Sequence, residues 1–221
     1  MNPVLVFDLN GTLTDTASLD PFFVNLFGSA DKRREWFTQM IELAMASSAT
    51  GYYVPFSKFA ESALQMLADR DGLSLIDEQR ADLLDRVSRM PLFPDVEPGL
   101  KKLAEDGFRL AVLTNSALTS AESALERLGI AKNFERILSA EMAQCFKPFP
   151  QVYRAAAREL KVTPGEMMMV AAHNWDTTGA IRAGCEAAFL TRPGEVLATT
   201  DPRPAVIASD LLDLPARLAA L

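Results

Sequence analysis

The sequence predicts an α/β fold: a parallel β-sheet covered by helices on both faces, in three α/β/α layers, with an all-helical insertion. Short continuous apolar runs at 4–7, 109–114 and 167–171 are typical of strands buried on both faces. From residue 96 onward such runs alternate with helical patterns, and this alternation implies parallel pairing. Residues 16–90 show helical spacing of apolar residues and no strand signal.

The first predicted strand, Val4-Leu5-Val6-Phe7, runs directly into Asp8. Asp8 is therefore expected at the carboxyl end of a buried strand, where ligands bind in open α/β sheets. Gly11 allows a sharp turn of the backbone beside it. A lone aspartate after a strand more often caps a turn, so its meaning depends on what else reaches the same edge.

The inserted helical block follows at once. Ser18 and Asp20 are suited to cap a helix start. Helices are expected over 21–27, from about residue 30 to a turn-rich connection at 47–55, and over 56–68 and 77–89. Prolines at 91, 94 and 98 then end the helical pattern. We accordingly divide the chain into a core domain, residues 1–15 and 91–221, and a cap domain, residues 16–90.

The second half alternates between strands and helices. Further strands are expected over 136–139, 186–190 and 205–208, and helices over 117–128, 150–160, 174–183 and 211–221. Gly129 and Gly184 are placed to end two of these helices.

Composition restricts the function. The 221 residues are 49% hydrophobic and carry a net charge of −7, which argues against binding to a nucleic-acid backbone but allows a small anionic substrate. One histidine and two cysteines, without CxxC spacing, do not form a Cys/His metal site. The N-terminal apolar run is too short for a signal peptide or membrane span, so we expect a cytoplasmic protein that does not bind membranes.

Polar groups lie where the predicted strands end or where the chain turns after them. Thr114-Asn115-Ser116, Lys147 and the segment 173–176 are expected to meet Asp8 at one sheet edge. A carboxylate nucleophile, a lysine that keeps it ionised and a second carboxylate form a set suited to covalent catalysis.

The order Asp8…Gly11-Thr12, Thr114-Asn115, Lys147-Pro148 and Asp176 resembles the haloacid dehalogenase superfamily. Within it, the segments 113–116, 146–153 and 174–180, together with the cap segment 36–64, look most like the type II 2-haloacid dehalogenases. The resemblance implies a Rossmann-like core with a helical cap, and it suggests a homodimer.

The resemblance also implies roles. Asp8 attacks the carbon that carries the halogen and forms an ester, which water then hydrolyses. Asp176 orients or activates that water, and Lys147 balances the two carboxylates. The substrate-binding residues it implies are Asn10, Thr12, Phe37, Thr114, Asn115, Tyr153, His173, Asn174 and Trp175. No metal or other cofactor is expected.

The main alternative is a Mg²⁺-dependent phosphatase of the same superfamily. Phosphatases usually place a second Asp two residues after the nucleophile and a Gly-Asp pair at the fourth motif; here Asn10 and Ala171-Ala172 stand there. An amide cannot protonate a leaving alcohol, and alanine supplies no ligand for Mg²⁺.

The match to the dehalogenases also has departures. Phe37 stands where they carry a cap arginine that stabilises the halide, although Arg33 and Arg34 lie one turn earlier. His173 replaces a frequent Asn, and Asn10 replaces a frequent Tyr. A non-catalytic binding protein on the same fold is the third hypothesis, against which the intact set of Asp8, Lys147 and Asp176 speaks.

Overall fold

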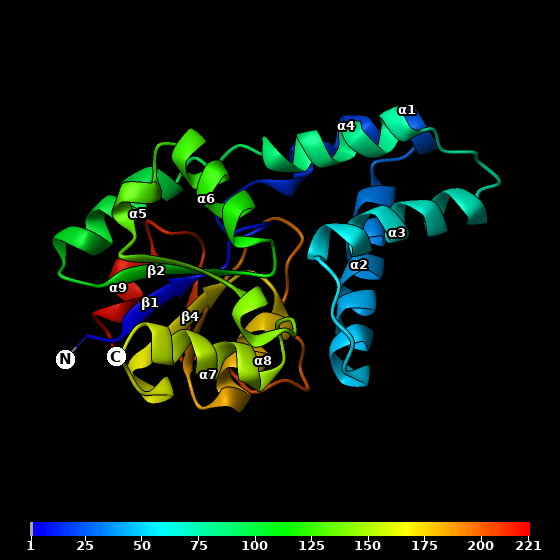
Figure 1. Cartoon of the computed structure of the whole chain (residues 1–221). Coiled ribbons are helices and arrows are strands. Elements are labelled where there is room, and N and C mark those ends of the chain that lie inside the picture. The colour runs from blue at the N-terminus through cyan, green and yellow to red at the C-terminus, as the bar shows by residue number, and fades with distance from the viewer. Residues whose placement is uncertain (1) are drawn as a thin grey trace.

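A computed structural model describes residues 2–221 and contains a six-stranded, wholly parallel sheet of order β3-β2-β1-β4-β5-β6 (Figure 1). The strands are β1 (Val4–Phe7), β2 (Leu110–Thr114), β3 (Arg136–Ser139), β4 (Met167–Ala171), β5 (Glu186–Leu190) and β6 (Val206–Ala208). The predicted α/β class and parallel sheet are confirmed.

The register brings the carboxyl ends of the central strands together. Phe7, the last residue of β1, pairs with Val112 on one side and with Val170 on the other. The backbone amide of Asp8 donates to the carbonyl of Val170 at 3.0 Å. Because β1 is flanked by β2 and β4, the loops that follow all three strands leave the same edge of the sheet, where a crevice forms.

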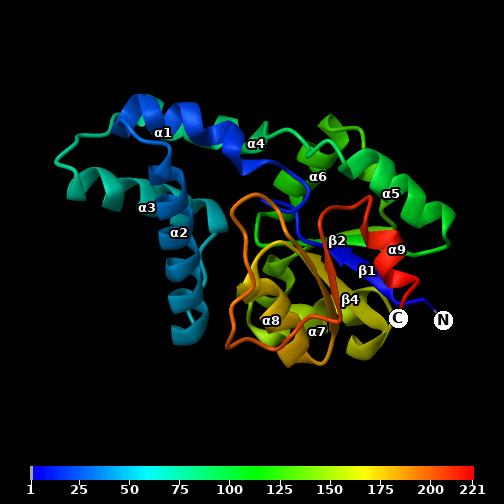
Figure 2. The same ribbon diagram turned by 180° about the vertical axis from the view of Figure 1, so that it is seen from behind.

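Two helical layers cover the sheet (Figures 1 and 2). The β1 residues Val4 and Val6 share a core with α7 (Pro150–Glu159) and α8 (Asn174–Ala183). Leu5 and Phe7 point the other way and share a core with α5 (Val96–Glu105), α6 (Leu118–Arg127) and α9 (Leu214–Leu218). Side chains alternate between the faces of a strand, so continuous apolar runs are needed to bury both.

Four helices stand apart from the sheet: α1 (Asp20–Phe27), α2 (Asp31–Thr50), α3 (Phe56–Arg70) and α4 (Asp77–Ser88) (Figure 1). These helices pack against one another through aromatic side chains. The rings of Phe23 and Trp36, for example, lie 5.5 Å apart between their centroids. Trp36 also donates its indole N–H to the carbonyl of Ala60 at 2.9 Å. Among residues 2–221, no helix combines the length and apolar character needed to cross a membrane.

Some elements differ from the expectation. Helix α5 lies outside the predicted helices, because Pro98 was expected to interrupt the helical pattern. Pro98 sits in the first turn of α5, where a missing N–H is tolerated. Gly99 is needed there, since an added Cβ would lie 2.4 Å from Cβ of Leu211. Helix α2 extends into the connection expected at 47–55 and ends at Thr50. Helix α9 covers Leu214–Leu218 and is shorter than the expected 211–221.

Candidate active site

Lys147 lies between two buried carboxylates. Its ammonium Nζ donates to Asp8 Oδ1 at 2.8 Å and to Asp176 Oδ2 at 2.6 Å. The third proton of Nζ goes to the carbonyl of Leu113 at 2.8 Å. Three donors therefore meet three acceptors, and the full hydrogen-bonding capacity of the ammonium group is used. Such complete pairing lets three charges remain buried together.

The turn after β1 holds the other oxygen of Asp8. The Thr12 hydroxyl donates to Asp8 Oδ2 at 2.9 Å and accepts from the amide of Ala172 at 3.1 Å. Gly11 adopts a φ of 81°, and an added Cβ would lie 2.9 Å from Cε1 of His173. Glycine is thus required both by the backbone and by the close approach of the imidazole.

His173 is stacked between two aromatic rings. Its centroid lies 5.1 Å from Phe37 on α2 and 5.1 Å from Trp175 on α8. Its Nδ1 lies 3.2 Å from Asp8 Oδ2. The cap residue Phe37 and the core residue Trp175 therefore orient the imidazole against the carboxylate.

The charges around Asp8 shift the pKa values of the group. Burial alone would raise the pKa of Asp8, but Lys147 and His173 outweigh it and hold the pKa well below its usual range. Burial lowers the pKa of Lys147 and of His173, yet the carboxylates beside them leave both raised. Asp176 ends with a raised pKa, because burial and Asp8 together outweigh Lys147. Asp8 is therefore the more acidic of the two carboxyl groups.

Tyr153 supports the second carboxylate from behind. Its hydroxyl donates to Asp176 Oδ1 at 2.7 Å, and burial followed by Asp176 raises the pKa of this phenol well above its usual value. Asp176 is fully buried and both of its oxygens are occupied, by Tyr153 and by Lys147. Asp176 is thus placed to position Lys147, and it does not line the cavity over Asp8.

Gly179, on α8 behind the site, is closely packed against its neighbours. A Cβ at Gly179 would lie 2.5 Å from the carbonyl oxygen of Pro148 and 2.7 Å from the hydroxyl of Tyr153. We expect Gly179→Ala to destabilise the protein by about 1–3 kcal/mol, as overpacking does, measured by urea unfolding. The control is Gly165→Ala, where the nearest atom would be 3.9 Å away. Equal stability of the two variants would contradict this packing.

A cavity of about 20 Å³ lies over the reacting groups. Its lining includes most of the predicted residues, namely Asp8, Asn10, Phe37, Thr114, Asn115, Lys147, His173 and Trp175. Ile41 and Phe56 also line it; their helical spacing favoured a place in the cap core, and no pattern in the sequence distinguished them. We call this space the catalytic pocket.

Three residues expected to bind substrate do not line the pocket. Thr12 and Tyr153 are fully buried and contact Asp8 and Asp176 instead. Asn174 is turned away: its side chain donates to the carbonyl of Val196 and accepts from the amide of Ala198. Asn174 thus anchors the loop after β5, because its position at the start of α8 faces that loop.

Asn115 and Asn10 have different surroundings. Asn115 Oδ1 accepts from the backbone amide of Lys147 at 2.9 Å, which fixes the lysine loop against the end of β2. Asn10 Nδ2 donates to Ser116 Oγ at 3.3 Å. Arg33, considered as a replacement for the missing cap arginine, pairs with Asp20 and donates to the Thr16 hydroxyl at 3.0 Å. Its guanidinium is committed within the cap.

The site does not suit a divalent cation. The ammonium group of Lys147 already bridges the two carboxylates where a metal ion would need their oxygens. Ala172 supplies no oxygen from its side chain, and no group of three His, Cys, Asp or Glu within residues 2–221 is arranged to hold a metal.

Comparison with known proteins agrees with this geometry. The chain is 28% identical to (S)-2-haloacid dehalogenase 2 of Pseudomonas sp. (strain CBS-3), over 96% of this chain and 93% of that protein. A solved L-2-haloacid dehalogenase superposes with a TM-score of 0.93 at 27% identity, covering 99% of both chains.

The L-2-haloacid dehalogenase of Xanthobacter autotrophicus, solved with chloropropionic acid covalently bound, has a TM-score of 0.91. It covers 100% of both chains at 23% identity, and so supports the fold alone. The family model of the haloacid dehalogenase-like hydrolases matches residues 3–184. The chain belongs to the haloacid dehalogenase-like hydrolases.

Proposed function

We propose that this protein hydrolyses the carbon–halogen bond of 2-haloalkanoic acids through an ester on Asp8. The observation that carries the proposal is an ionised Asp8 carboxylate, paired with Lys147, at the floor of a pocket with aromatic walls. Relatives with a similar sequence are named (S)-2-haloacid dehalogenases. The amide of Asn10 cannot supply the proton that a phosphatase gives its leaving alcohol, whereas a halide leaves without one.

In the first step an oxygen of Asp8 attacks C2 of the substrate. Oδ1 is the attacking atom in our assignment, because it accepts only from Lys147, while Oδ2 already has Thr12 and His173 as partners. A carbon–oxygen bond forms, the carbon–halogen bond breaks, and the halide leaves with the electron pair. The chain itself supplies the nucleophile, so the step needs no cofactor.

In the second step, water attacks the ester carbonyl of Asp8, and His173 accepts its proton. In the resting site Asp8 raises the pKa of His173 and so favours its protonated form, the imidazolium. Ester formation removes the negative charge of Asp8, and the imidazolium then pairs with the halide. The halide and one proton depart, since the burial that remains lowers the pKa of His173. The imidazole then takes a proton from water, the hydroxy acid leaves, and the carboxylate–imidazolium pair is restored.

His173→Asn tests this role. Asparagine keeps a polar side chain but cannot accept a proton, so we expect ester hydrolysis to slow by about 10²- to 10³-fold. The halide is released in the first step, so the variant is expected to give one equivalent of halide per active site followed by a slow phase. Rapid-quench halide assays and the intact mass of the enzyme that carries the ester on Asp8 measure both. If the variant turns over at the wild-type rate and shows no burst of halide, His173 is not the base.

The function is tested by measuring halide release from (S)-2-chloropropionate and bromoacetate in EDTA. Release would support dehalogenation without a metal. If halide release is absent while a phosphate ester is hydrolysed in the presence of Mg²⁺, the proposal is wrong and the phosphatase alternative holds. If neither halide release nor phosphate-ester hydrolysis is detected, a non-catalytic binding protein is favoured.

Three further points remain part of the proposal. The division into a core, 1–15 and 91–221, and a cap, 16–90, is supported by the position of the four cap helices (Figure 1). A homodimer is expected from the resemblance, and light scattering of the purified protein tests it. We also propose a cytoplasmic location, and fractionation of cells tests it.

A further inference from the structure

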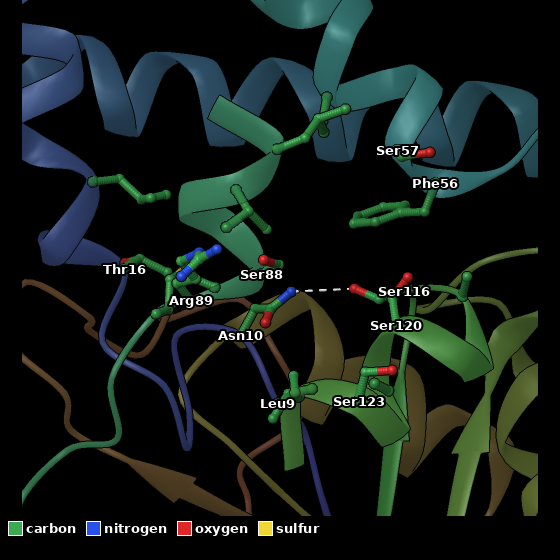
Figure 3. A pocket seen from close by; sticks show the side chains of 18 of the residues that line it. Leu9, Asn10, Thr16, Phe56, Ser57, Ser88, Arg89, Ser116, Ser120 and Ser123 are labelled. Carbon is green, nitrogen blue, oxygen red and sulfur yellow. Dashed lines mark hydrogen bonds between the residues drawn. The ribbon is translucent and has the colours of Figure 1, made fainter. Parts of the chain in front are cut away.

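A second and much larger cavity adjoins the catalytic pocket. It has a volume of about 650 Å³ and lies between the cap helices and α6 of the core (Figure 3). Volumes of this size are typical of sites that enclose small organic ligands. We call it the cap–core chamber; the residues that matter here are Trp36, Met40 and Leu84 from the cap and Ser116, Ser120 and Ser123 from the core.

The chamber and the catalytic pocket share walls. Asn10, Phe37 and Phe56 line both spaces. The hydrogen bond from Asn10 to Ser116 joins two residues that line the chamber, as Figure 3 shows. Its donor, Asn10, also lines the catalytic pocket. A molecule seated over Asp8 therefore reaches the chamber by passing Asn10.

The catalytic pocket cannot hold a substrate by itself. Its volume of about 20 Å³ is near that of a single water molecule measured in the same way. The reacting carbon fits over Asp8 only if the rest of the acid extends into adjoining space. The chamber provides that space without a change in the position of Lys147 or Asp176.

The two walls of the chamber differ in chemistry. On the cap side, Trp36 and Met40 are buried and apolar, and the indole N–H of Trp36 is already bonded to the carbonyl of Ala60. On the core side, Ser120 and Ser123 follow one another along the exposed side of α6. An alkyl chain can pack on the cap wall while the hydroxyl groups remain hydrated at the open side.

We propose that the cap–core chamber binds the substituent on C2, so that the preferred substrates are 2-halo acids with an alkyl chain of about four to six carbons beyond C2. This inference rests on the proposed dehalogenation and names its substrate class. Each methylene removed from water favours binding about fourfold. We expect kcat/KM for 2-bromohexanoate to exceed that for 2-bromopropionate by on the order of 10- to 50-fold.

A variant on the core wall tests the chamber directly. Ser120→Trp places a large ring on the exposed face of α6 at the chamber wall, and we expect the ratio of kcat/KM for 2-bromohexanoate to that for bromoacetate to fall at least tenfold. Glu122→Trp is the matched control, because Glu122 is exposed on the same helix and does not line the chamber. Its ratio is expected to equal that of the wild type. A flat chain-length series, or equal ratios in both variants, would overturn the inference.

A binding measurement separates this inference from the proposed reaction. Octanoate carries a hexyl group on C2 and no halogen, so it cannot react. We expect calorimetry to show octanoate binding more tightly than acetate, and Ser120→Trp to remove the difference. If octanoate binds in this way but no halide is released from any halo acid, the chamber stands and dehalogenation fails. If halide is released but octanoate binds no better than acetate, dehalogenation stands and the chamber assignment fails.

Discussion

Asp8→Asn is expected to lower halide release from 2-halo acids by at least on the order of 10⁴-fold, the scale seen when a covalent nucleophile is removed. The amide oxygen of asparagine carries no full negative charge and is a poor nucleophile toward carbon. Halide release in EDTA, measured at saturating substrate, gives the difference. Release by the variant at a rate near that of the wild type would remove Asp8 from the mechanism.

The fold is expected to survive this change. Lys147 keeps Asp176 and the carbonyl of Leu113 as acceptors, so one buried cation still meets one buried carboxylate. Circular dichroism and the urea midpoint check that the lost activity is not lost folding. Asp8→Ala, whose side chain cannot revert to aspartate by deamidation, is the second variant.

Isotopic labelling tests the ester itself. In a single turnover of excess wild-type enzyme in H₂¹⁸O, the oxygen transferred to C2 comes from Asp8, so the first hydroxy acid formed is expected to be unlabelled. The heavy oxygen enters the Asp8 carboxylate and is detected in the peptide that contains it. Labelled product from the first turnover would mean that water attacks the substrate directly.

Lys147→Met is expected to have the largest effect on stability, a loss of about 3–5 kcal/mol, together with loss of activity. Lys147 and Asp176 are almost wholly buried and Asp8 is 5% exposed, so removal of the cation leaves Asp176 without its counter-ion and Asp8 with His173 alone. Methionine has similar length and keeps the packing of the side chain. Urea unfolding monitored by fluorescence measures the loss, and the exposed Lys132→Met is the control.

The pH dependence of that loss has a defined sign. In the wild type the pKa of Asp8 is depressed on folding, so its pairing stabilises the protein above about pH 4 and the benefit declines as the pH falls. In Lys147→Met the carboxyls lose the charge that opposed protonation. We therefore expect the deficit of the variant to shrink on acidification.

A double variant keeps this prediction testable if Lys147→Met does not fold. Adding Asp8→Asn removes one of the two carboxylates that lost Lys147 as a partner, so the double variant is expected to be more stable than Lys147→Met alone. If the double variant is less stable than either single variant, the charge account is wrong.

The order of the buried strands and of the polar groups after them could be read from the chain. Apolar runs such as Val4–Phe7 are local signals, and a parallel sheet brings their carboxyl ends together whatever the details of packing. This is why Asp8, Lys147 and Asp176 were predicted as one site. Local signals were weaker for α5, where Pro98 obscured a helix whose apolar face is buried by the sheet.

Only the tertiary structure decided where the side chains point. Asn174 faces the loop after β5, Tyr153 stands behind Asp176, and His173 is held between Phe37 and Trp175, although Phe37 lies 136 positions earlier in the chain. The cap–core chamber likewise exists only because helices far apart in the sequence leave space between them. The sequence by itself determined the fold class and the reacting groups, because those follow from local periodicity and strand order; packing between distant segments determined which groups meet a substrate.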